Sequence, residues 1–298
     1  PTSKENALPA STLFEETGNR LSRYDQKRRP FILWIATGSF ILSLILASNI
    51  EIGDVFVGLF PADSRVRIDY EAANLAMGGV NPIDISIEGS SSDVFTDPKI
   101  LRELDILQNW LLLQPEVGAV NGVTDHVKML NRYLADDPEG GIPESRDAIR
   151  QMLFVGEGKL LRGVINIDRS ATLIHIRLTV DDTSKIGKFI DRLNTQLNQL
   201  PTGLSTRLTG GAVVMTESVR QATTGQLMSV GLALVLIYLC LSIQFMSLKV
   251  GLLATLPTAL QTAIYFGILG LLGVRLNPTS VLVECLVLGL AIDDTIHY

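Results

Sequence analysis

The stretch Gly289-Leu290-Ala291-Ile292-Asp293-Asp294-Thr295-Ile296-His297-Tyr298 decides the class of this protein. It places two adjacent carboxylates in an apolar run that starts at Thr279 and contains one other acidic side chain, Glu284. An aspartate near the centre of a membrane-spanning helix costs about 2.5–3.5 kcal/mol on insertion scales, and such residues usually serve ion or proton pathways. The sequence therefore predicts a proton relay at Asp293 and Asp294. The alternative is that the helix ends early and both carboxylates lie at the membrane surface.

The apolar residues of the chain are concentrated in a few long runs. The 298 residues are 47% hydrophobic, and the mean hydropathy is +0.30. Four runs approach the roughly 20 residues that a helix needs to cross a bilayer: Phe31–Ala47, Leu227–Phe245, Val250–Gly273 and Thr279–Tyr298. We therefore expect a membrane protein with an α-helical bundle of four spans and a large external α+β domain.

The expected domain boundaries follow from these runs. Residues 1–27 form a polar tail or linker and 28–49 the first span. Residues 50–222 form the external domain, and residues 223–298 contain the other spans at about 227–245, 250–273 and 279–298.

The charges predict how the chain is oriented. The net charge is −6, and no basic run suits nucleic acid. Basic residues gather before the first span, at Arg20, Arg23, Lys27, Arg28 and Arg29. By the positive-inside rule the N-terminus is cytoplasmic, and residues 50–222 lie on the periplasmic or extracellular side.

The external domain is predicted to consist of alternating strands and helices. Strands are expected at Ile83–Glu88, Val117–Val123, Val164–Ile167, Thr172–Val180 and Leu204–Leu208, the third and fourth as a hairpin. Helices are expected from Asp97-Pro98 to before Pro115, from Thr124-Asp125 to about Leu134, after Pro143, and over Ser184–Leu200. These segments give two β-α-β-like modules, which suit a small split α+β sandwich.

A polar helix over Glu217–Gly225 is expected to continue into the second span. It follows the break at Thr209-Gly210-Gly211, and no strong helix breaker separates it from the apolar run. A continuous helix would couple the external domain mechanically to the membrane.

Other residues of the spans are candidates for a pathway or for packing. His297 follows Asp293 by four positions, on the same helix face, and could extend the relay or lie at the wet boundary. Glu284 is about 15 Å from Asp294 along the axis and could line the outer half of a pathway. The glycines Gly267, Gly270, Gly273 and Gly289 would let helices approach closely.

The remaining reactive side chains do not indicate an enzyme. Cys240 and Cys285 lie inside predicted spans and are expected to pack as small apolar residues. His126 and His175 have no metal-ligand spacing around them. Because nucleophile-elbow and phosphate-loop motifs are missing from the sequence, we expect no enzyme, no cofactor and no metal.

The arrangement resembles half of a resistance–nodulation–division (RND) transporter, closest to its hydrophobe/amphiphile efflux and MmpL-like exporters. The motif Gly289-Leu-Ala-Ile-Asp293-Asp294-Thr-Ile-His297 looks like the fourth-helix motif of that superfamily. The stretch from Asp97-Pro98 through Trp110 and Thr124-Asp125 to Pro143-Glu144-Ser145-Arg146 is more loosely similar to its external porter domain. The resemblance covers roughly residues 28–298.

The resemblance implies a function and partners. It implies export of lipids or other hydrophobic or amphiphilic compounds driven by the proton gradient, with Asp293 as the relay aspartate and Asp294 beside it. It implies a bacterial inner membrane and two halves of six spans each. The partners would then be membrane lipids, the substrate, and the remaining half of the same transporter or a second copy; the chain would be part of a longer polypeptide.

Two other classes of protein fit one span followed by a domain and three spans. A permease subunit powered by a separate ATPase would need no carboxylates in the membrane. A membrane receptor for lipids or sterols would bind its ligand without proton-dependent flux. Neutralising the Asp pair distinguishes both from a proton-driven exporter.

Overall fold

The computed structural model describes residues 30–134, 140–158 and 160–297, with the side chains of 292–297 outside the description. The predicted tail and the basic cluster before the first span therefore lie outside the described residues. The chain divides into two units. We call Glu51–Gln226 with Leu276–Pro278 the α+β unit, and the apolar helices around it in sequence the helical unit.

The α+β unit contains a short sheet and the helices that cover it. Its elements are η1 (Val57–Leu59), α2 (Arg65–Ala76), β1 (Asn81–Gly89), η2 (Val94–Thr96), α3 (Pro98–Leu112), β2 (Val117–Asn121), α4 (Val123–Leu134), α5 (Arg146–Gly156), β3 (Ala171–Leu178), α6 (Thr183–Leu197) and β4 (Leu204–Thr209).

The sheet has the order β2-β3-β1-β4, and each neighbouring pair is antiparallel. Strand β1 lies in the middle, where Ile85 is opposite Ile174 of β3 on one side and Leu208 of β4 on the other. Because β1 and β2 both run antiparallel to β3, they are parallel to each other and need the crossover helix α3 between them. Strands β3 and β4 both run antiparallel to β1, so they are parallel to each other and are connected by the crossover helix α6.

The two expected β-α-β-like modules are present as β1-α3-β2 and β3-α6-β4, and they interleave in one sheet with one shared core. The result is the split β-α-β arrangement known as ferredoxin-like. Alternating patterns in the sequence identify strands, but they do not say which strands become neighbours.

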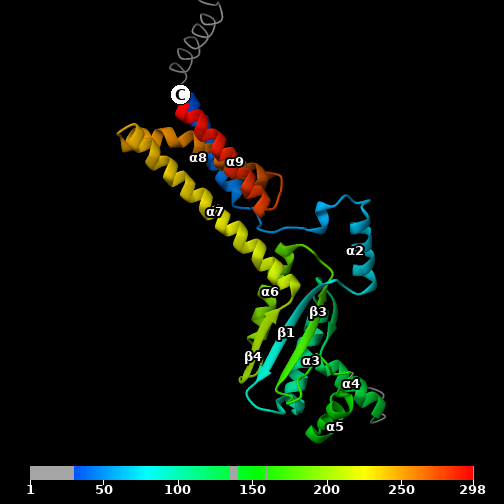
Figure 1. Cartoon of the computed structure of the whole chain (residues 1–298). Coiled ribbons are helices and arrows are strands. Elements are labelled where there is room, and N and C mark those ends of the chain that lie inside the picture. Colours follow the sequence, from blue (N-terminus) through cyan, green and yellow to red (C-terminus); the bar gives the residue numbers. More distant parts are fainter. Residues whose placement is uncertain (1–29, 135–139, 159, 298) are drawn as a thin grey trace, which may run out of the picture. The chain divides into compact units, whose positions relative to one another are not determined.

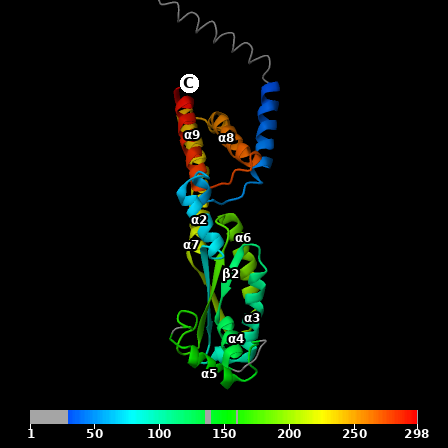
Figure 2. The same ribbon diagram turned by 90° about the vertical axis from the view of Figure 1, so that its right-hand side faces the viewer.

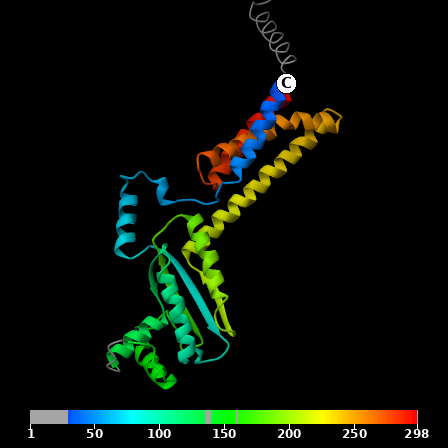
Figure 3. The ribbon, with the colours of Figure 1, turned by 180° about the vertical axis from the view of Figure 1, so that it is seen from behind.

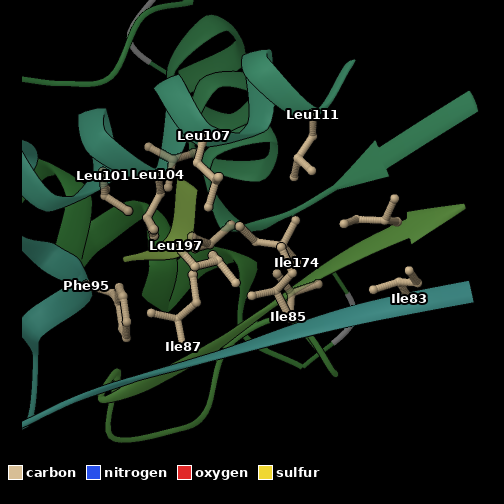
Figure 4. Close-up of a cluster of buried hydrophobic side chains, with 14 of the residues drawn as sticks. Ile83, Ile85, Ile87, Phe95, Leu101, Leu104, Leu107, Leu111, Ile174 and Leu197 are labelled. Carbon is tan, nitrogen blue, oxygen red and sulfur yellow. The ribbon is translucent and has the colours of Figure 1, made fainter. Parts of the chain in front are cut away.

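One face of the sheet carries the core. Ile83, Ile85 and Ile87 of β1 are fully buried, whereas the alternate residues Asp84 and Glu88 are not. Helices α3 and α6 lie on the same side of the sheet. They are behind the sheet in Figure 1 and beside it in Figure 2, and Figure 3 shows the molecule from behind. The close-up in Figure 4 shows the leucines of α3 above the isoleucines of β1 and β3.

The helix starts follow local capping chemistry. The Asp97 carboxylate accepts from the backbone N–H of Lys99 at the start of α3, with Pro98 in the first turn, as the sequence predicts. The Asp182 carboxylate caps α6 in the same way, by accepting from Ser184 N–H. These caps supply acceptors for N–H groups that have no partner inside the helix.

Two local predictions were wrong, and one helix was not predicted. Residues 164–167 do not form a strand; a single bridge from Ile165 to Thr172 replaces the expected hairpin. Helix α4 begins at Val123, before Thr124, and the Asp125 side chain folds back to accept from Gly122 N–H. Helix α2 was not expected, since it has no buried residues and thus no apolar stripe to reveal it.

The chain enters and re-enters the α+β unit at one place. Ile52 forms a parallel bridge with Leu276, from the connection between the later helices α8 (Leu248–Leu271) and α9 (Pro278–His297). Glu51 then accepts from Ser184 Oγ and pairs with Lys188, both on α6. The segment after the first apolar helix therefore contacts both the segment after α8 and the first turns of α6.

The helical unit contains the helix Pro30–Ala47 and the helices α7 (Gly211–Gln244), α8 and α9. Among the described residues, the first three are long and apolar enough to cross a membrane, and the apolar part of α9 covers Pro278–Ala291. The count of four spans therefore stays a prediction. Large apolar side chains point outward along these helices, including Trp34 at 78% exposed. Such a surface needs lipid or protein to cover it.

Helix α7 is continuous from the end of the sheet into the apolar stretch. It begins at Gly211 and runs for 34 residues, so the predicted polar helix over 217–225 is its first part. The preceding Gly210 has φ +110°, and a Cβ there would lie 2.7 Å from the Pro82 carbonyl oxygen. Glycine is required at this turn because any side chain would collide with β1.

We expect Ile85→Ala to destabilise the protein by about 2–5 kcal/mol, because it leaves a cavity between β1 and the covering helices. Ile167→Ala is the matched control, since Ile167 is 81% exposed. Thermal unfolding of the full chain in detergent, followed by circular dichroism, measures both. Equal unfolding temperatures for the two variants would contradict the assigned core.

Candidate functional site

Helix α9 carries every acidic residue that the sequence predicts for the site. Glu284 lies in its second turn, and Asp293, Asp294 and His297 lie in its last turns. Asp293 follows Glu284 by nine positions, about 14 Å along the helix axis. The side chains of Asp293, Asp294 and His297 lie outside the described residues, so the predicted relay between them stays a prediction. The helix itself continues through all three positions.

Glu284 is completely buried inside the helical unit. Its relative exposure is 0%, and neither carboxyl oxygen has a hydrogen-bond partner among the described side chains. Val281 and Leu288, one turn before and one turn after it, are also buried. Protein, and not only lipid, therefore surrounds this carboxyl group. A buried polar group without a partner is uncommon and needs an explanation.

Hydroxyl groups of α8 lie next to Glu284. Tyr265 Oη donates to the Ser280 carbonyl oxygen at 2.7 Å, and Ser280 precedes Glu284 by one helical turn. Thr262 interacts with Glu284, although its Oγ1 and the carboxyl oxygens do not meet hydrogen-bond geometry. The carboxyl group and the Thr262 hydroxyl are thus two unsatisfied polar groups that face each other.

Further threonines extend this polar surface along α8. Thr255, Thr258 and Thr262 are all buried, at the spacing of one helix face. Thr255 Oγ1 donates to the Gly251 carbonyl oxygen at 2.8 Å, a common way for a threonine to satisfy itself within an apolar helix. Sequence reasoning missed this stripe. Its signal was threonine at the i, i+3 and i+7 positions of an otherwise apolar run.

The predicted packing glycines have different surroundings. A Cβ at Gly267 would lie 2.8 Å from Ser43 Cα, and one at Gly270 would collide with the Leu46 carbonyl oxygen, both on the first apolar helix. A Cβ added at Gly289 would meet no described atom within 4 Å. Gly273 has φ +64° just after α8, so it ends that helix and does not lie in a helix contact.

The histidines and cysteines do not assemble into a metal centre within the described residues. His175 Nδ1 is 2.7 Å from Asp84 Oδ1, across neighbouring strands. His126 lies on α4, and its buried Nε2 has no hydrogen-bond partner there. Cys240 is exposed on α7, Cys285 is partly buried on α9, and neither forms a disulfide.

A cleft of about 780 Å³ lies in the α+β unit, beside the loop between α5 and β3. Leu153, Leu161 and Ile165 supply apolar walls, and Arg169 supplies a charge that is paired with Asp93 at 3.1 Å. Its volume is in the range of small-molecule sites. Nothing in the sequence pattern had indicated this cleft, because its lining comes largely from turns and not from periodic elements.

Comparison with known proteins gives one coarse result. No protein-family model matches the chain. A protein of Methanocaldococcus jannaschii named "Putative membrane protein MJ1562" is 21% identical over 295 residues, which cover 96% of this chain and 74% of that protein. The similarity to a membrane protein over nearly the whole chain agrees with the apolar helices. Together they place the chain in the class of membrane proteins.

We expect the stability of the α+β unit to fall as the pH is lowered through about 6.5. Burial lowers the pKa of His126, more than the neighbouring Asp125 raises it. The unfolded chain, with an ordinary histidine pKa of about 6.5, therefore binds a proton at a higher pH than the folded chain. Protonation therefore favours the unfolded state, and the free energy of unfolding decreases as the pH falls below this value.

His126→Gln should flatten this part of the pH–stability curve, measured by thermal unfolding between pH 5 and pH 8 in steps. His175→Gln is the matched control, because it removes the other histidine of the unit, which has Asp84 as its partner. A curve that changes only in His175→Gln would contradict the assignment.

Proposed function

We propose that this protein is a proton-driven membrane transporter of the RND type, which exports lipids or other hydrophobic or amphiphilic compounds. The observation that carries the proposal is that one apolar helix, α9, holds Glu284, Asp293 and Asp294. Carboxylates are costly inside a bilayer, and a helix with three of them is typical of a proton or ion pathway. In this proposal Asp293 and Asp294 bind and release the proton, and His297 extends the relay.

The order of the elements supports a transporter. One apolar helix precedes the α+β unit, and α7, α8 and α9 follow it with short connections. The cleft beside Arg169 has both apolar walls and a charged group, which suits an amphiphile. Residues 51–226 would then be the substrate-handling side, and α9 the proton side.

The partner in this proposal is the remaining half of the same transporter or a second copy of the chain, because the RND type implies two such halves.

We expect Asp293→Asn to abolish proton uptake by vesicles that contain the full-length protein, because an amide does not bind the proton. A pH-sensitive dye inside the vesicles measures uptake after an imposed pH jump. Asp69→Asn is the matched control: it removes the same charge from the exposed helix α2. Wild-type uptake by the Asp293→Asn protein would reject the proposal and favour the ATP-driven permease or the receptor.

We expect Gly225→Pro to stop export of a fluorescent phospholipid probe while the α+β unit stays folded. A proline inside a helix costs about 3 kcal/mol and interrupts the backbone ladder, here in the middle of the continuous helix α7. Gly225→Ala is the control, because a Cβ at this position meets nothing within 4 Å. Normal export by the folded proline variant would contradict coupling through α7.

A further inference from the structure

Glu284 has surroundings that fit an uncharged carboxylic acid and not a carboxylate. Within residues 30–47, 227–244, 250–271 and 278–291 it is the only Asp, Glu, Lys, Arg or His. The titratable side chain that faces it from α8 is Tyr265, whose hydroxyl is engaged with the Ser280 carbonyl oxygen. No cation from these stretches therefore offsets a negative charge at this position.

The free-energy cost of the two forms differs strongly. A buried ion without a partner carries a penalty of several kcal/mol even after relaxation. A neutral carboxylic acid avoids this penalty, and it gains one O–H donor that the carboxylate lacks. Thr262 Oγ1 is itself buried and unpartnered beside Glu284. A hydrogen bond from the acid O–H to Thr262 Oγ1 would satisfy both groups at once.

We propose that Glu284 is a second proton-binding site, separate from Asp293 and Asp294, which holds its proton at neutral pH against Thr262. Proton binding converts the carboxylate to the acid, whose O–H then donates to Thr262 Oγ1. Release returns the proton to water and leaves the carboxylate. The role of this proton in transport rests on the proposed function, but the existence of the site does not.

The threonine stripe gives this proton further hydroxyl groups along α8. Thr258 and Thr255 continue from Thr262 toward the start of the helix and are buried as well. Successive members are about 6 Å and 4.5 Å apart along the axis, distances that one water molecule bridges. Each hydroxyl both donates and accepts, as stepwise proton transfer requires.

Infrared difference spectroscopy of the full-length protein in vesicles tests the site without added reagents. We expect a protonated-carboxyl C=O band at pH 7, where a glutamate side chain in water is ionised. The band should disappear in Glu284→Gln and persist in the double variant Asp293→Asn/Asp294→Asn. A band that survives in Glu284→Gln, or that is missing from the wild type at pH 7, would overturn the proposal.

Two further variants keep the test decisive. Glu284→Asp retains a carboxyl group, so a folded protein should keep a band at shifted frequency if Glu284→Gln fails to fold. Thr262→Val removes the acceptor and should move the wild-type band to higher frequency. Thr255→Val is the matched control on the same helix, because the Thr255 hydroxyl is bound to the Gly251 carbonyl oxygen, and it should leave the band in place. An unchanged frequency in Thr262→Val would reject Thr262 as the partner.

The outcomes separate this site from the transport mechanism. A Glu284 band together with normal proton uptake by Asp293→Asn would reject the proposed function and leave the site intact. Loss of uptake in Asp293→Asn without any Glu284 band would support the proposed function and reject the Glu284 site. Removal of the band by sodium chloride at constant pH would show a sodium site in place of a proton site, and would overturn this inference.

Discussion

The hydrocarbon tails of lipids cannot hydrogen-bond to a polar group, and the apolar helices of this protein follow from that constraint. In the apolar helices the backbone N–H and C=O groups are paired along each helix, since the bilayer core offers no other partner. The sheet edges β2 and β4 belong to the α+β unit and not to the apolar helices. The same constraint makes Glu284 informative, because a buried carboxyl group without a hydrogen-bond partner among the described side chains costs much less free energy as the neutral acid than as the carboxylate.

The α+β unit is connected to the apolar helices by several stretches of the chain. Helix α7 leaves the sheet at Gly211 without a break. The segment Glu51–Asp54, after the first apolar helix, is bound to Leu276, after α8, and to the start of α6. The connections from the first apolar helix and from α8 therefore meet inside the α+β unit, near the start of α6.

Much of the local structure could be predicted from the sequence, because its causes are local. The alternation around Ile85 indicated β1, and the Asp97-Pro98 pair indicated the start of α3. Helix α2 could not be predicted, because it has no periodic apolar pattern. The apolar residues at 164–167 indicated a strand where the chain forms turns and one bridge, because a short apolar run does not by itself fix strand pairing. Two β-α-β-like modules in a split α+β sandwich were expected, but the strand order β2-β3-β1-β4 was not, because strand order depends on contacts between residues far apart in the chain.

The candidate site divides in the same way. The sequence by itself determined that carboxylates lie in an apolar helix, because residue type and the length of an apolar run are properties of the chain alone. Only the tertiary structure decided that Glu284 is enclosed by protein and that Thr262 and Tyr265 face it. The physical reason is that burial and hydrogen bonding depend on which helices pack together, and no single helix carries that information.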